Sequence, residues 1–107
     1  MEWLAAFVLT LVVELPVLFF LLWDLDRRRV ILCGLLMNLF SHPALWFLFP
    51  QLLPAEYYLA LGELLVLVIE YTSLKIFFPK ENSSLLLLTA FAVNALSFLA
   101  GVLIYPL

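Results

Sequence analysis

Four long apolar stretches restrict the folds that this sequence can adopt. Each reaches the roughly 20 residues that a helix needs to cross about 30 Å of hydrocarbon. Hydrophobic residues make up 67% of the 107 residues and charged residues 12%, against about 45–50% and 25% in soluble domains. A chain of this length has too little interior to hide so much apolar surface from water. We therefore expect an all-α membrane protein with transmembrane helices over residues 3–23, 30–49, 57–78 and 85–105.

An internal repeat divides the chain into two copies of one helical hairpin. A gapless alignment of residues 1–51 with residues 57–107 pairs identical polar residues and prolines: Glu14 with Glu70, Asn38 with Asn94, Ser41 with Ser97, and Pro50 with Pro106. Self-similarity at a fixed offset is typical of a duplicated structural unit. We expect a single transmembrane domain, residues 1–107, built from two tandem αα-hairpins. Because each hairpin crosses the membrane twice, the two are parallel repeats related by a pseudo-twofold axis along the membrane normal.

The basic residues all lie on one side of the predicted bundle. Three are in the first connection, one is in the third, and one is a turn inside the third helix: Arg27, Arg28, Arg29, Lys80 and Lys75. Basic residues in short loops favour the cytoplasmic side, and a lysine near a helix end can extend to the interface. We predict an integral protein of the inner or plasma membrane, with loops 24–29 and 79–84 in the cytoplasm and both termini outside.

Polar residues inside the predicted helices form the candidate site. Four of them lie near the bilayer midplane: Glu14, Asn38, Glu70 and Asn94. An ionisable side chain at that depth costs about 2.5–3.5 kcal/mol on insertion scales. Four more share helix faces with them and are secondary members of the site: Ser41, His42, Glu63 and Ser97. Carboxyl and amide oxygens are the ligands that a proton relay or a hard cation uses, so we predict one central proton- or cation-binding site.

Prolines interrupt the helices of the first half. Pro16 and Pro43 lack an N–H group, and they free the backbone carbonyls of Val12 and Leu39 close to the level of the candidate site. We expect both carbonyls to add oxygen ligands there. Pro50 is expected to end the second helix.

Three functions compete for this pattern. The first is a small transporter or channel that binds or conducts a proton or small cation. The second is an accessory or assembly subunit of a larger membrane complex, whose polar residues form interhelical hydrogen bonds of about 0.6–2 kcal/mol each. The third is an intramembrane enzyme, which we do not expect because the sequence has one Glu-x-Pro and one histidine, without the paired glutamates and second histidine that such a site needs.

Cofactors and most partner classes are not expected. One histidine, His42, makes neither a zinc nor a haem site, and one cysteine, Cys33, reads as a small apolar filler within a helix. We therefore expect no metal and no cofactor. The expected partners are the lipid bilayer, a proton or small cation, and either a second copy of the chain in a homodimer or a larger membrane complex. Nucleic acid is not expected to bind.

Overall fold

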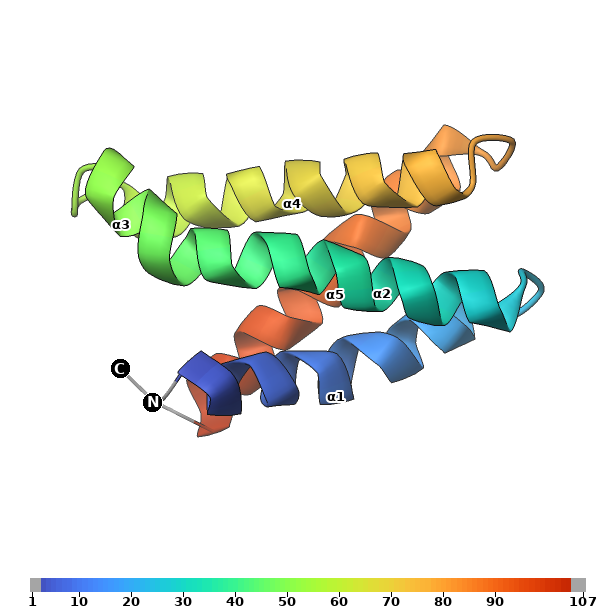
Figure 1. Ribbon diagram of the computed structural model, residues 1–107, viewed down its shortest axis with the longest axis horizontal. Helices are drawn as coiled ribbons and strands as arrows, with labels where there is room; N and C mark the ends of the chain where they lie inside the picture. The colour runs from blue at the N-terminus through green and yellow to red at the C-terminus, as the bar shows by residue number, and fades with distance from the viewer. Residues whose placement is uncertain (1–2, 105–107) are drawn as a thin grey trace.

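The computed structural model describes residues 3–104, which form helices and short connections and contain no strand. The helices are α1 (Trp3–Leu21), α2 (Arg27–Pro43), the π-helix η1 (Ala44–Leu48), α3 (Phe49–Leu52), α4 (Tyr58–Phe77) and α5 (Ser83–Ile104). Because α2, η1 and α3 follow one another without a break, they act as one long helical segment (Figure 1). The prediction of an all-α fold is confirmed.

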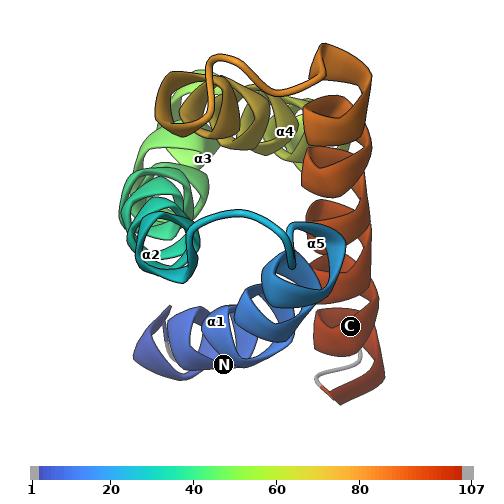
Figure 2. The same cartoon turned by 90° about the vertical axis from the view of Figure 1, so that its right-hand side faces the viewer.

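The four long helical segments form a ring. Viewed from one end, α1 is followed around the ring by α2, α4 and α5, and α5 lies beside α1 again (Figure 2). The helices of each hairpin are antiparallel neighbours, so both chain ends and α3 lie at one end of the molecule (Figure 1). The α1–α2 and α4–α5 connections lie at the other end. In both views α5 is steeply inclined to the other three helices.

Polar and apolar residues are distributed inversely to those of a water-soluble protein. Large apolar side chains are exposed on all four long helices, whereas six polar side chains are buried: Glu14, Asn38, Ser41, His42, Glu70 and Thr89. Three segments of the described chain are long and apolar enough to cross a membrane, namely Trp3–Leu21, Arg27–Leu52 and Ser83–Ile104. The fourth, α4, has 20 residues but carries Glu63, Glu70 and Lys75, so its crossing stays a prediction.

A closely packed apolar core fills the half of the bundle next to the α1–α2 and α4–α5 connections. It consists of Leu18, Leu22, Val30, Cys33, Met37, Leu74, Phe78, Leu86, Ala90 and Val93. Every long helix contributes to this apolar core, which therefore holds all four together at that end. Cys33 is fully buried within it, in the place expected of a small apolar filler.

The second helix is longer than predicted at both ends. It begins at Arg27 instead of residue 30, because the Asp26 side chain accepts a hydrogen bond from the Arg28 backbone N–H (3.1 Å) and caps the helix. Pro50 does not end it, which corrects the prediction: the π-helix leads directly into α3, and Pro50 lies in the first turn of α3. A proline there is tolerated because a first-turn N–H has little need of a helical partner. The helical segment ends only after Leu52.

Two side chains hold the α4–α5 connection, and one of them, Lys75, extends beyond its helix end as expected. The Lys75 ammonium group extends out of α4 to the Glu81 carbonyl (3.2 Å) and the Ser83 hydroxyl (2.9 Å). The Asn82 side chain accepts a hydrogen bond from the Ser84 N–H (2.8 Å) and caps α5. Both contacts tie the α4–α5 connection to the helix ends.

A glycine permits the close approach of α1 and α2. A Cβ atom added at Gly34 would lie 2.7 Å from Leu15 Cδ2 and 3.0 Å from Leu18 Cδ1. Both distances are too short for ordinary carbon contacts. Gly34 therefore lets the Leu15 and Leu18 side chains of α1 pack against α2 beside the apolar core, and a larger residue would force these side chains to shift.

We expect Gly34→Ala to destabilise the bundle, because overpacking costs about 1–3 kcal/mol. Gly101→Ala is the matched control, since a Cβ atom there has no neighbour within 4 Å. Both changes gain about 1 kcal/mol of helix propensity, so their difference isolates the steric effect. Unfolding titrations of the detergent-solubilised protein will measure it, and equal stabilities for the two variants would contradict the close approach.

Candidate functional site

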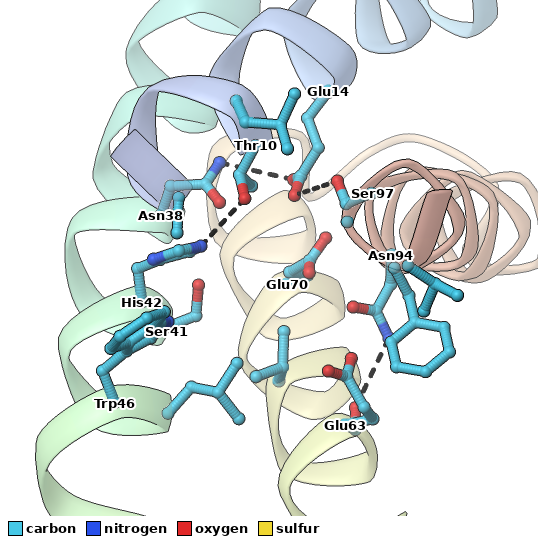
Figure 3. A pocket seen from close by; sticks show the side chains of 17 residues that line it. Thr10, Glu14, Asn38, Ser41, His42, Trp46, Glu63, Glu70, Asn94 and Ser97 are labelled. Atoms are coloured by element: carbon cyan, nitrogen blue, oxygen red, sulfur yellow. Dashed lines mark hydrogen bonds between the residues drawn. The ribbon is translucent and has the colours of Figure 1, made fainter. Parts of the chain in front are cut away.

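A polar cavity lies inside the ring, with a volume of about 230 Å³. All eight residues predicted for the site line it (Figure 3): Glu14, Asn38, Ser41, His42, Glu63, Glu70, Asn94 and Ser97. They come from α1, α2, α4 and α5, and the helical spacing of three and four residues places each set on one inward face. The structure thus brings the predicted residues together, while their function stays a prediction.

The cavity occupies the half of the bundle that is nearer the chain ends. Glu14, Asn38, Glu70 and Asn94 form its floor, because each lies next to or one turn from a fully buried residue of the apolar core. Glu14 and Glu70 are one turn from Leu18 and Leu74, and the two asparagines directly follow core residues, Met37 and Val93. The apolar core therefore closes the cavity toward the α1–α2 and α4–α5 connections.

The Glu14 carboxyl group joins three helices. Asn38 Nδ2 in α2 donates to Glu14 Oε1 (3.3 Å), and the Ser97 hydroxyl in α5 donates to Glu14 Oε2 (2.7 Å). Asn38 Nδ2 also donates to the Gly34 carbonyl of its own helix (2.8 Å). Glu14 and Asn38, two of the predicted site residues, therefore form a first Glu–Asn pair, and the Glu14 carboxyl group has a donor on each oxygen (Figure 3).

Glu70 is buried without a hydrogen-bond partner. Its side chain is 0% exposed, and neither carboxyl oxygen has a partner within residues 3–104. Asn94, the counterpart of Asn38 in the repeat, would form the corresponding pair with Glu70, but it donates from Nδ2 to the backbone carbonyl of Glu63 (3.4 Å). The expected hydrogen bond of the second pair is thus not formed, and Glu70 points into the cavity with both oxygens free (Figure 3).

His42 lies between α1 and α2 at the side of the cavity. Its Nε2 atom is 2.8 Å from the Thr10 hydroxyl, and its ring packs edge-on against Phe7 with centroids 5.6 Å apart. Its Nδ1 atom is buried and has no partner in the described chain. The histidine therefore links α1 and α2 at the level of Thr10, one turn nearer the start of α1 than Glu14.

Nine of the lining residues were not predicted, and two of these nine have polar side-chain atoms, Thr10 and Trp46. Thr10 lies four positions before Glu14, and Trp46 lies four positions after His42. That spacing puts each on the same helix face as a residue that was predicted, so the signal was present in the sequence.

The carbonyls freed by proline are not part of the site. Neither Val12 nor Leu39 lines the cavity, and their side chains are 63% and 52% exposed on the outer surface. The expectation that these carbonyls add ligands is therefore wrong. Val12 lies two positions before Glu14, and Leu39 lies two positions before Ser41. Helix residues at that spacing do not face the same side, so both positions lie away from the polar face.

The π-helix forms one wall of the cavity. Leu45 and Trp46 of η1 line it, and the Tyr58 hydroxyl donates to the Leu45 carbonyl, which ties α4 to η1. Short π-helices widen the backbone turn and are frequent at functional sites. This one follows Pro43, which cannot donate to the helix.

The carboxyl groups of the cavity lie outside any cluster of metal-ligating side chains within residues 3–104. In the part of the chain that the structure describes, no three His, Cys, Asp or Glu side chains converge as metal ligands.

No family model, curated protein or solved structure matches the chain. The function of the cavity must therefore be inferred from its chemistry.

We expect Ser97→Ala to destabilise the bundle by about 0.6–2 kcal/mol, the range of interhelical hydrogen bonds in membranes. The control is Ser73→Ala, because the Ser73 hydroxyl donates to the Ile69 carbonyl of its own helix (2.7 Å) and joins no other. Reversible unfolding in mixed micelles will compare them. The bridging function of Glu14 is refuted if Ser73→Ala costs as much as Ser97→Ala.

Proposed function

We propose that the protein is an integral membrane transporter or channel that binds a proton or small cation in its central cavity. The observation that carries this proposal is Glu70, a fully buried carboxyl group without a partner that faces a cavity with two further carboxyl groups, Glu14 and Glu63. An unpaired carboxylate in an apolar interior is strongly unfavourable. A bound proton or cation removes that cost, and intramembrane carboxyl groups that face a bundle interior usually have such a function.

Membrane insertion of all four long helices is part of the proposal. The apolar outer surface and the three long apolar segments support it. The charged residues of α4 are compatible with a fourth crossing, because Glu63 and Glu70 face the cavity and Lys75 extends to the connection at the helix end. Lipid would then contact only the apolar face of α4.

The tandem repeat is also part of the proposal. In the ring, α1 lies opposite α4, and α2 lies opposite α5 (Figure 2). A twofold axis through the cavity relates opposite helices in this way, which supports the parallel-repeat arrangement. The steep inclination of α5 and the different partners of Glu14 and Glu70 show where the two halves diverge.

The two midplane glutamates have different tasks in this mechanism. Glu14 is held by donors from α2 and α5 and provides a fixed negative or neutral group. Glu70 has no donor and exchanges its proton or cation with the cavity. Because the apolar core closes the floor, exchange takes place from the end that carries the termini, and passage through the membrane requires the core to separate.

We expect Glu70→Gln to reduce proton or cation flux in proteoliposomes to the level of protein-free vesicles, because the change keeps the shape and removes the exchangeable group. Glu14→Gln is expected to act in the same direction. Glu81→Gln is the control, since Glu81 lies in the α4–α5 connection, outside the cavity. A vesicle-entrapped pH dye and an alkali-ion indicator will report the flux.

The alternative is an accessory subunit of a larger membrane complex. The three-helix bridge at Glu14 favours it, because a structural hydrogen bond requires no ligand. If folded Glu14→Gln and Glu70→Gln variants keep normal flux, or if the wild type has none and co-purifies with a larger complex, the subunit function replaces the transport function.

The topology has its own test. With Cys33 replaced by serine, a cysteine substituted for Gln51, an exposed residue of α3, is expected to react with an impermeant thiol reagent added from outside. The basic connections predict this orientation. Labelling from the cytoplasmic side alone would reverse it.

A further inference from the structure

We propose that the ligand of the cavity is a small organic cation with several N–H donors, a primary ammonium or guanidinium group, in place of a bare metal ion. The inference rests on the proposed cation-binding function and specifies its ligand class. Four observations lead to it: which hydrogen-bond groups are free, how the carboxyl groups are spread, the sign of the charge, and the apolar and aromatic walls.

The unpartnered carboxyl group of the cavity is Glu70, whereas the amide nitrogens are already used. The Asn38 amide nitrogen already donates to Glu14 and Gly34, and the Ser97 hydroxyl donates to Glu14. The Asn94 amide nitrogen donates to the Glu63 carbonyl. By contrast, both oxygens of Glu70 are free. An ammonium or guanidinium group satisfies both oxygens with N–H donors, whereas a metal ion would need several further oxygen ligands from the lining.

The cavity holds three carboxyl groups without a cluster of three metal-ligating side chains, and it is larger than one small ion. Glu14, Glu63 and Glu70 all line the cavity, yet no three acidic, histidine or cysteine side chains in residues 3–104 converge as metal ligands. The volume of about 230 Å³ exceeds the roughly 30 Å³ that one water molecule occupies in the liquid. A polyatomic cation can bridge separated acceptors across such a space, with a planar guanidinium group binding a carboxylate through two parallel hydrogen bonds.

The charge of the lining favours a cation. Three carboxyl groups border the cavity, and its described lining contains no lysine or arginine. An anionic ligand would therefore meet only like charge. A positively charged group placed near Glu70 would compensate the buried carboxylate directly.

The remaining walls suit an organic body. Trp46 and Phe98 line the cavity together with aliphatic residues such as Leu9 and Val66. Aromatic faces attract cations by cation–π interaction, and aliphatic side chains stabilise alkyl groups by burial. A hydrated alkali ion is not stabilised by aliphatic walls, whereas an alkylammonium ion can contact both the aromatic and the aliphatic side chains.

Calorimetric titration of the full-length protein in lipid nanodiscs tests the proposal. The probes are ethylammonium chloride and millimolar guanidinium chloride, with sodium and potassium chloride at the same ionic strength as comparison. We expect saturable binding of at least one organic cation, weakened about tenfold or more in Glu70→Gln because a charge-assisted hydrogen bond is lost. Glu81→Gln is expected to bind like the wild type.

A second variant tests how binding depends on the size of the ligand, without changing the charge of the cavity. Gly101 lines the cavity and has open space at its Cβ position, so Gly101→Leu reduces the volume without removing a polar group. It is expected to weaken binding of the organic cations and to leave proton uptake unchanged. Gly101→Ala provides a smaller step of the same kind.

The outcomes distinguish the two proposals. Binding of sodium or potassium, or proton exchange at Glu70, without binding of either organic cation overturns the ligand class and keeps the proposed function. If neither organic cations, alkali ions nor protons interact with the wild type, both proposals fail. Organic-cation binding that Glu70→Gln does not change places the ligand elsewhere and also overturns the inference.

Discussion

The carboxyl group of Glu14 connects α1 to α2 through Asn38 and to α5 through Ser97. The ring depends on this connection, because α1 and α5 belong to different halves of the chain and close the ring against each other. Lipid solvates apolar side chains well, so apolar contacts between helices provide little net attraction in a membrane. Polar contacts and close packing therefore contribute more to helix association. Gly34 allows the close packing, and it is also the residue whose carbonyl positions the Asn38 amide.

The same arrangement leaves Glu70 without donors. By the repeat, Ser41 and Asn94 correspond to the two residues that hold Glu14, yet Asn94 donates to the Glu63 carbonyl and Glu70 has no partner in the described chain. The two halves of the chain make different contacts, which leave one carboxyl group satisfied and one unsatisfied although the residue types are the same. A duplicated hairpin with identical contacts in both halves would have no free acceptor in its interior.

Much of the fold and of the candidate site could be predicted from the sequence, since apolar length determines helices and the spacing of three and four determines faces. The eight polar residues met around one cavity for that reason. The spacing does not determine how helices cross, so the inclination of α5 and the change of partner at Asn94 were not predictable. The prediction for Pro50 was wrong because the effect of a proline on a helix depends on its position within a helical turn. The π-helix before it places Pro50 in the first turn of α3.

The contrast between the apolar core and the polar cavity has a consequence for local stability. Backbone amides beside the core, around Met37 and Val93, are protected by contacts from every long helix. Those around Trp46 and Gly101 border open space. Local opening needs least free energy where buried contacts are fewest, so amide hydrogen exchange should be graded along each helix, fast at the end that carries the termini and slow at the other. The helix ends around the cavity could then separate while the apolar core holds the other ends of the helices together.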